Sequence, residues 1–228
     1  MTIMECVDLS KQYGARENPV RAVDGISLSI QQGSFTAITG PSGSGKSTLL
    51  HLLGGLDRPS GGEVLFQGKN LYSFRDEQLA VLRRRQFGFV FQNYNLVQEL
   101  TGYENILLPL MLDNRKPDER YLNHIISILG IGDRVDHLPR AMSGGQQQRF
   151  AIARALANKP QIQFADEPTG NLDGQMGRLV IDLLRELNRE LGVTLVLVTH
   201  DLGVAEQAER IIHLTDGKIL RDSGGAEA

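Results

Sequence analysis

A glycine-rich segment in the first quarter of the chain has the residue types and spacing of a site for phosphate chemistry. It lies between a β-rich run, Phe35 to Thr39, and an apolar helical run, Leu49 to Leu56. Its residues are Gly40, Pro41, Ser42, Gly43, Ser44, Gly45, Lys46, Ser47 and Thr48. A strand, such a loop and a helix in this order are typical of phosphate-binding loops. The glycines free backbone N–H groups, Lys46 reaches the β- and γ-phosphates, and the Ser47 hydroxyl coordinates Mg²⁺. The segment therefore predicts a nucleoside-triphosphate site.

A second group is the pair Asp166 and Glu167, which ends a predicted strand over Ile162 to Ala165. Asp166 suits a Mg²⁺-holding acid, directly or through water. Glu167 suits a general base that orients and deprotonates an attacking water. A lone Asp-Glu pair would more often be a loop or a helix cap, but the phosphate loop upstream favours the catalytic interpretation.

The third group is Ser143, Gly144, Gly145, Gln146 and Gln147, which precedes a helical run, Gln148 to Leu156. A serine followed by two glycines at a helix start exposes backbone N–H groups and a hydroxyl to an anion. Taken alone, the group is better explained as a simple N-cap. Its occurrence with the other two groups favours an anion-binding role.

In this order and spacing the three groups resemble the ABC ATPase family, and the resemblance covers essentially the whole chain. Single residues match further family signatures. Tyr13 matches the aromatic residue that stacks on adenine, and Gln92 the glutamine that touches Mg²⁺ and the attacking water. His200 matches the histidine that contacts the γ-phosphate, and Asn171-Leu172-Asp173 looks like the loop that communicates across a dimer, with Asp173 counted among the nucleotide-binding residues.

The resemblance implies ATP and Mg²⁺ as cofactors and a site divided between two copies of the chain. The Ser143 to Gln147 element of one copy would face the γ-phosphate held by the Lys46 loop of the other. Mg²⁺ would be held by Ser47, Gln92 and Asp166, and catalysis would rest on Glu167, His200 and Gln92. ATP binding would close the head-to-tail dimer and hydrolysis would loosen it.

Other segments, among them Gly54 to Asp57 and Glu167 to Asp173, resemble the branch with macrolide-export, lipoprotein-release and antimicrobial-peptide-resistance ATPases. That implies a separate membrane permease, driven in export or force transmission. We expect it to dock on the apolar-rich region Leu96 to Leu112, after Gln92. The alternative is a regulatory ATPase that controls a cell-wall hydrolase through a membrane partner.

The elements that must position these residues are predicted from periodicity as an α/β fold. Antiparallel β-strands open the chain, with turns at Asp24-Gly25 and Gln32-Gly33, and a parallel sheet follows from the later alternation of strands and helices. The resemblance implies a P-loop NTPase core with an N-terminal antiparallel β subdomain. A helical subdomain at approximately residues 93–158 would be inserted in this single domain of residues 1–228.

Composition narrows the class of protein. A net charge of −3 and 41% hydrophobic residues predict a globular domain without a general nucleic-acid surface. The longest run free of polar residues, Ile106 to Leu112, is too short to span a membrane. A single cysteine, Cys6, and the lack of a signal-like start predict a cytoplasmic chain, peripheral on the inner membrane face through its permease.

Four further features lead to structural expectations. Gln163 interrupts an apolar strand, which indicates a less buried strand end. The run Arg83 to Arg85 is expected to be a solvated helix face. The tail from Ser223 is expected to be disordered. The remaining histidines, which lack metal-ligand spacing, are expected on the surface or hydrogen-bonded: His51, His124, His137 and His213.

Overall fold

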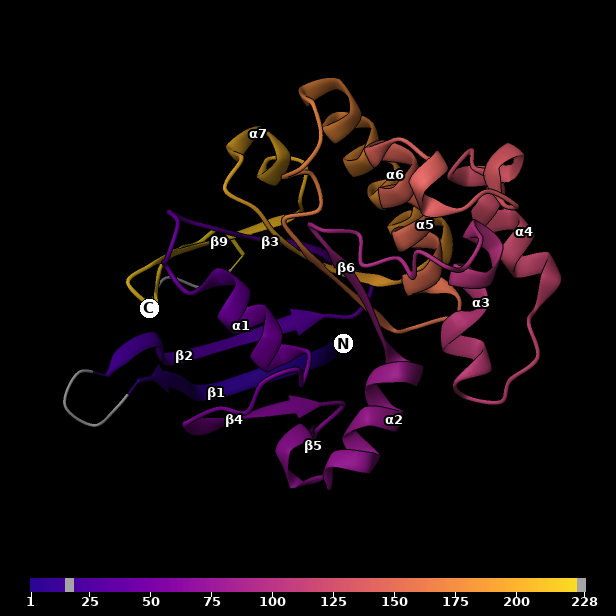
Figure 1. The fold of residues 1–228 in the computed structure, drawn as a ribbon. Helices are drawn as coiled ribbons and strands as arrows, with labels where there is room; N and C mark the ends of the chain where they lie inside the picture. The colour runs from indigo at the N-terminus through magenta and orange to yellow at the C-terminus, as the bar shows by residue number, and fades with distance from the viewer. Residues whose placement is uncertain (15–18, 225–228) are drawn as a thin grey trace. The chain divides into compact units, whose positions relative to one another are not determined.

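The computed structural model describes residues 1–14 and 19–224, and the chain divides into two compact units. The first unit comprises Met1–Arg83 and Thr194–Ala228, and the second comprises Arg84–Val193. Each unit combines helices with β-strands (Figure 1). This mixed α/β content, with an antiparallel sheet at the N-terminus, confirms the predicted fold class.

The antiparallel sheet of the first unit contains β1 (Thr2–Tyr13), β2 (Val20–Gln31), β4 (Gly61–Phe66) and β5 (Lys69–Asn70), in the order β2-β1-β4-β5. The turn predicted at Asp24-Gly25 is wrong, because β2 continues through both residues. Gly25 has a positive φ of 67°, and its N–H donates to the Ser10 hydroxyl. The strand therefore absorbs the irregularity as a local shift in its pairing with β1.

Four more strands of the first unit lie in the order β10-β9-β3-β8. Their bounds are β3, Phe35–Thr39; β8, Thr194–Val198; β9, Arg210–Thr215; and β10, Lys218–Asp222. Central β3 runs parallel to both neighbours, β8 and β9, and β10 returns antiparallel after the turn at Asp216-Gly217. Every residue of β3 and β8 is buried, as in parallel strands covered on both faces.

Two helices and a short 3-10 turn complete the first unit. Helix α1 (Lys46–Leu53) contacts β8 and also β1 and β2, and α7 (Leu202–Ala205) contacts β3. The 3-10 turn η1 (Leu71–Ser73) follows β5. Helix α2 (Asp76–Gln86) crosses the boundary between the units, which falls between Arg83 and Arg84.

The second unit pairs β6 (Phe87–Phe91) with β7 (Ile162–Asp166) in parallel. The ring of Phe164 on β7 contacts the rings of Phe87 and Phe89 on β6, each with centroids 5.5 Å apart. A Cβ on Gly88 would lie 2.3 Å from the backbone oxygen of Ala155, so this position needs glycine for β6 to approach α5 (Gly144–Leu156).

Helix α5 packs on β6, and further helices of the second unit pack on α5. The helices of this unit are α3 (Gly102–Met111), α4 (Glu119–Ile128), α5 and α6 (Gly174–Leu191), with 3-10 turns η2 (Gly132–Arg134) and η3 (Pro139–Ala141). Both α3 and α4 pack on α5, and α4 also contacts α6 (Figure 1). A Cβ on Gly102 would lie 2.4 Å from the Phe150 ring, so the missing side chain lets α3 approach α5.

The arginine run is only in part the solvated face that its charge predicted, since the Arg85 side chain is 51% exposed and that of Arg84 only 28%. Within the second unit, Arg84 and Arg85 both bind the Asp113 carboxylate, at 2.7 and 2.8 Å. The Asp113 side chain is only 1% exposed. A buried carboxylate must be paired to remain charged, and two adjacent arginines provide the partners.

Asp113 makes stability depend on pH in the acid range. The hydrogen bond from Arg85, with help from Arg84, holds the pKa of Asp113 below its ordinary value although burial opposes this. Because the pKa is lowered on folding, the stabilisation is present at neutral pH and is lost as pH falls through about 4 and below. We expect Asp113→Asn to lower the melting temperature by roughly 3–6 °C at pH 7 and by much less near pH 3.

Asp133→Asn, at an exposed ion pair, is the control and should have little effect at either pH. An equal loss at both pH values for Asp113→Asn would contradict the assignment.

Gln163 on β7 also differs from expectation, because the side chain is fully buried. Neither its Oε1 nor its Nε2 has a hydrogen-bond partner among the described residues. Every residue of β7 from Ile162 to Ala165 is buried, so the strand is not less buried at Gln163. A buried amide without partners destabilises the folded state.

We expect Gln163→Met, which keeps the side-chain length and removes both polar atoms, to raise the free energy of unfolding by about 1–2 kcal/mol. Gln148 is the matched control, since it is equally buried but donates from Nε2 to the Pro168 oxygen at 2.7 Å. Gln148→Met should destabilise the protein. Chemical denaturation measures both variants, and destabilisation by Gln163→Met would show that its amide is satisfied in solution.

Smaller expectations are settled by the same structure. Cys6 is buried, and burial raises the pKa of its thiol to about 12. His213 is hydrogen-bonded to the Thr39 hydroxyl, at 3.0 Å. The tail prediction is wrong for Ser223, which exchanges hydrogen bonds with Ile211, while residues 225–228 lie outside the described residues. Within the described ranges, no helix is long and apolar enough to cross a membrane.

Candidate functional site

The phosphate loop connects β3 to α1 in the first unit, and three of its glycines have backbone conformations that other residues rarely adopt. The φ angles of Gly40, Gly43 and Gly45 are 145°, 79° and 97°. A Cβ on Gly40 would lie 2.1 Å from the Leu214 oxygen, and one on Gly45 would lie 1.9 Å from the Ala22 oxygen. Both conformation and space therefore require glycine at positions 40 and 45.

The first turn of α1 differs from the other helix starts that have an assigned cap. Helices α3, α4, α5, α6 and α7 each begin with a side chain that accepts from a backbone N–H: Thr101, Asp118, Ser143, Asp173 and Asp201. In α1 the N-cap is Gly45, and no side chain among the described residues caps the turn. The positive end of the α1 dipole is thus directed at the loop, where an anion is stabilised.

Two polar side chains of the loop, those of Lys46 and Ser44, are buried. The Lys46 ammonium donates to the backbone oxygens of Gly40 and Pro41, both at 2.9 Å, so it lies across the loop. The Ser44 hydroxyl is buried and has no hydrogen-bond partner among the described residues. A cation, a buried hydroxyl and helix-terminal N–H groups together suit a polyphosphate.

His200 follows β8, the strand that runs parallel to β3. The pairing of Ile38 with Val198 puts the ends of the two strands level, and the Thr199 N–H donates to the Ile38 oxygen at 3.1 Å. Because carboxyl ends of parallel strands meet at one edge, His200 and the phosphate loop leave the sheet on the same side. The predicted role of His200 at the γ-phosphate stays a prediction.

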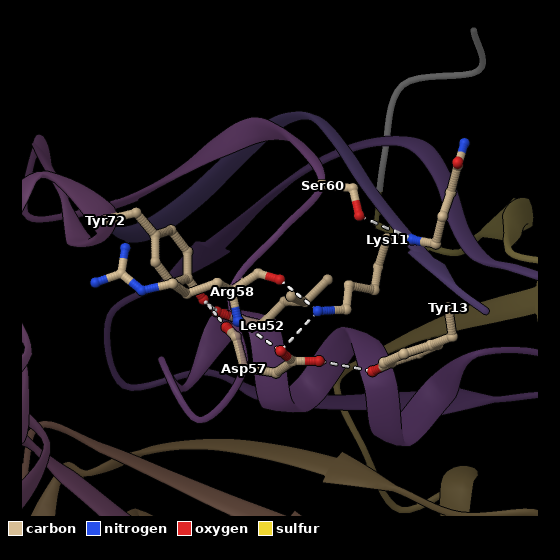
Figure 2. Close-up of polar contacts among 8 residues, drawn as sticks. Lys11, Tyr13, Leu52, Asp57, Arg58, Ser60 and Tyr72 are labelled. Carbon is tan, nitrogen blue, oxygen red and sulfur yellow. Dashed lines mark hydrogen bonds and ion pairs between the residues drawn. The ribbon is translucent and has the colours of Figure 1, made fainter. Parts of the chain in front are cut away.

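Tyr13, at the end of β1, is 43% exposed, which leaves the residue accessible to a ligand. Its hydroxyl donates to Asp57 Oδ2 at 2.7 Å (Figure 2). Partial burial and this hydrogen bond raise the pKa of Tyr13, so the hydroxyl stays protonated at neutral pH. The first unit therefore contains the aromatic residue, the phosphate loop and His200.

In the second unit, the parallel strands β6 and β7 bring Gln92 and the two carboxylates to one edge. Phe91 is level with Asp166, so Gln92 and Glu167 both follow directly after the paired strand ends. Glu167 has a φ of 47°, in the left-handed region, and its backbone oxygen accepts from Gly170 N–H at 3.0 Å. A non-glycine residue in this conformation is uncommon and is often found at functional positions.

Gln92 and Asn171 form a reciprocal amide pair within the second unit. Gln92 Nε2 donates to Asn171 Oδ1 at 3.1 Å, and Asn171 Nδ2 donates back to the Gln92 backbone oxygen at 3.0 Å. Asn171 Nδ2 also donates to Asn93 Oδ1 at 3.0 Å. A Cβ on Gly170 would lie 2.7 Å from Gln92 Nε2, so the pair needs glycine beside it.

Ser143 is the N-cap of α5, as its simplest interpretation predicted. Its hydroxyl accepts from Gln146 N–H, and Gln146 Oε1 accepts from Ser143 N–H, which together form a capping box. The next two positions are crowded. A Cβ on Gly144 would lie 2.7 Å from the Tyr94 hydroxyl, and one on Gly145 would lie 2.5 Å from Met176. The capping box and the two crowded glycines together define the start of α5.

The predicted site residues therefore fall into two groups, one in each unit. The first unit has Tyr13, residues 40–48 and His200; the second has Gln92, residues 143–146, Asp166, Glu167 and Asp173. The three predicted Mg²⁺ ligands are divided as well, with Ser47 in the first unit and Gln92 and Asp166 in the second. No cluster of three or more His, Cys, Asp or Glu side chains suited to a metal occurs in the described part of the chain.

Comparison with known families decides the identity of the fold. The family model described as ABC transporter matches residues 23–170, which include the phosphate loop, the Ser143 element and the Asp166-Glu167 pair. The chain belongs to the ABC transporter family. It is an ATP-binding and ATP-hydrolysing cassette of that family.

Two relatives agree with this membership. The chain is 46% identical to the macrolide export ATP-binding/permease protein MacB of Hyphomonas neptunium over 99% of its own length, but it spans only 35% of that protein. It is 41% identical to the lipoprotein-releasing system ATP-binding protein LolD of Idiomarina loihiensis, over 97% of this chain and 98% of LolD. Both belong to the branch that the sequence segments predicted.

A solved ABC structure is similar over nearly all of the chain. The ATP-binding cassette MJ0796, a dimer in a post-hydrolysis state bound to ADP and Pi, aligns with a TM-score of 0.87 at 42% identity. The alignment covers 96% of this chain and 97% of the MJ0796 chain.

Three side chains at the ABC site elements were not predicted as site residues. Asp57 and Lys11 contact Tyr13, and Arg154 donates to the backbone oxygens of Tyr94 and Asn95, just after Gln92. Gly54 to Asp57 was noticed only as a marker of the branch. The contact could not be read from the sequence because Asp57 lies 44 residues from Tyr13.

Proposed function

We propose that the chain works as a head-to-tail dimer with each ATP held between the phosphate loop of one copy and the Ser143 to Gln147 element of the other. The observation that carries this proposal is the phosphate loop itself, where positive-φ glycines meet an uncapped helix start. The dimeric structure of MJ0796 with ADP and Pi supports the arrangement in a close structural neighbour.

The side chains have distinct roles in this proposal. The Tyr13 ring stacks on adenine, the N–H groups of residues 40–48 surround the phosphates, and Lys46 and His200 contact the γ-phosphate. Glu167 orients the attacking water and accepts its proton. Asp173 lies at the start of α6, where it reaches toward the nucleotide of the opposite copy.

The proposed magnesium ligands have suitable chemistry. The Ser47 hydroxyl, the Gln92 amide oxygen and the Asp166 carboxylate are hard oxygen donors, which Mg²⁺ prefers. These three groups would hold the ion, which would supply positive charge against the phosphates. Ser47 supplies its hydroxyl from the first turn of α1, next to the loop that holds the phosphates.

We further propose that the dimer drives a separate permease and lies on the inner face of the membrane through that partner, in export or force transmission. LolD, similar over almost its full length, is named for a lipoprotein-releasing system, and MacB is named as both ATP-binding protein and permease. These relatives favour transport over the alternative, a regulatory ATPase that controls a cell-wall hydrolase.

Burial within the Leu96 to Leu112 region supports a smaller docking surface for the permease than the whole region. Leu96, Ile106 and Leu110 are buried, so the interior of the Leu96 to Leu112 region belongs to the core of the second unit. Met111 and Leu112, at the end of α3, are 62% and 63% exposed. We therefore place the permease contact at these two side chains.

Co-purification tests this contact. We expect the double variant Met111→Ser, Leu112→Ser to lose the membrane protein that solubilised membranes yield with the tagged wild-type chain, because the exposed apolar contact is removed. Leu202→Ser, equally exposed at 63% but in the first unit, is the control and should retain it. Retention by the double variant would place the contact elsewhere.

A further inference from the structure

A set of polar contacts in the first unit holds the side chain of Tyr13. Its hydroxyl donates to Asp57 Oδ2, and the Lys11 ammonium donates to Asp57 Oδ1 at 2.6 Å (Figure 2). Lys11 also donates to the Arg58 backbone oxygen at 2.6 Å. The Asp57 carboxylate thus bridges Lys11 and Tyr13, one on each oxygen.

These contacts fix both the edge and one face of the tyrosine ring. The hydroxyl bond to Asp57 holds the edge, and Lys11 Nζ lies 4.9 Å from the ring centroid, within the range of a cation–π contact. With 43% of the residue exposed, ring surface is still available to a ligand. The ring is therefore held in place before a ligand arrives, which lowers the entropy lost on stacking.

Asp57 is itself anchored to the helix that begins at the phosphate loop. Helix α1 starts at Lys46 and ends at Leu53, a length of about 12 Å. The Tyr72 hydroxyl shares its one hydrogen between the backbone oxygens of Leu52, in α1, and Asp57, and this ties the two segments together (Figure 2). One rigid helix thus connects the phosphate loop to the carboxylate that holds Tyr13.

The charge of the Asp57 carboxylate at neutral pH strengthens its hydrogen bonds to Lys11 and Tyr13. Burial acts to raise the pKa of Asp57, but the hydrogen bonds from Lys11 and Tyr13 outweigh it and hold the pKa below its ordinary value. Asp57 is therefore an ionised acceptor, while Tyr13 stays a protonated donor. Charge-assisted bonds of this kind are stronger than neutral ones.

We propose that Lys11 and Asp57 are positioning residues for the base of the nucleotide: they hold the Tyr13 ring at a set distance from the phosphate loop and thereby raise affinity for ATP without touching it. The inference rests on the proposed stacking of Tyr13 on adenine.

The test compares ATP with a ligand that has no base. Isothermal titration calorimetry would measure the affinities for ATP and for tripolyphosphate of the wild type, Tyr13→Phe, Asp57→Asn and the double variant. Tyr13→Phe keeps the ring and removes the hydroxyl, and with it the bond to Asp57 and the hydrogen-bond interaction with Thr48. We expect each single variant to weaken ATP binding about fivefold, the change expected for one hydrogen bond, and the double variant to be no weaker than Asp57→Asn. Tripolyphosphate affinity should not change.

Two controls separate the possible failures. Asp76→Asn removes a neighbouring exposed carboxylate that pairs with Arg58 and should bind ATP as the wild type does. Tyr13→Ala removes the ring; if it leaves ATP affinity unchanged, the proposed adenine contact itself is wrong. If Tyr13→Ala weakens ATP binding while Tyr13→Phe and Asp57→Asn do not, only the positioning role is wrong. Equal weakening of ATP and tripolyphosphate by Asp57→Asn would also overturn it, because Asp57 would then act on the phosphate loop.

Discussion

Glu167→Gln is expected to reduce steady-state ATP hydrolysis by about 100-fold or more, because the amide cannot accept the proton of the attacking water. Nucleotide binding should persist, since the change removes a base and leaves the phosphate loop intact. ATP would then remain bound, and the variant should elute as a dimer from a size-exclusion column run in ATP and Mg²⁺. A phosphate-release assay and the column profile measure the two effects.

The matched control is Glu190→Gln, an exposed position on α6 that should retain wild-type turnover.

A second variant tests the head-to-tail arrangement of the dimer. Adding Ser143→Arg to Glu167→Gln should abolish the ATP-dependent dimer, because a bulky side chain would occupy the face that meets the partner's nucleotide. Full turnover by Glu167→Gln would show that another group is the base, and a persistent dimer with Ser143→Arg would refute the proposed interface.

Gly45→Ala is expected to weaken ATP binding by about 100-fold or more, because the loop cannot keep its shape with a side chain at that position. The new Cβ would lie 1.9 Å from the Ala22 oxygen, and the backbone φ is 97°. One of the two segments must move, and the N–H groups of the loop move with it.

Gly43→Ala provides a closely matched comparison. Gly43 also has a positive φ, 79°, but a Cβ there would meet nothing within 4 Å. Its cost is limited to the strained conformation, about 1–2 kcal/mol. Calorimetry with ATP should therefore show a small loss for Gly43→Ala and a large one for Gly45→Ala; similar losses would mean that contact with Ala22 does not determine the loop shape.

The sequence predicted structure correctly where the local residue pattern matches the burial that the fold gives to the segment. Strand β3 begins and ends at the predicted residues, because a short, fully buried run rich in β-forming residues between turn signals leaves few alternatives. The spacing of glycines around Lys46 likewise sufficed to predict the phosphate loop. The roles taken from family resemblance, such as those of Tyr13 and His200, remain predictions about chemistry.

Long-range contacts and irregular strands could not be predicted from the sequence in the same way. Periodicity predicts a turn at Asp24-Gly25, but pairing with β1 carries the strand through it. The polarity of Gln163 and of Arg84 suggested exposure, whereas tertiary packing buries one and pairs the other with Asp113. Such outcomes depend on side chains distant in sequence, which no local pattern specifies.

The reciprocal amide pair of Gln92 and Asn171 makes the two loops thermodynamically linked. Any ligand that turns the Gln92 side chain away must break the bond from its Nε2 to Asn171. The same bond is lost when a binding partner draws Asn171 away, so the second event no longer has to break it. Each displacement therefore favours the other by the same free energy, whichever occurs first.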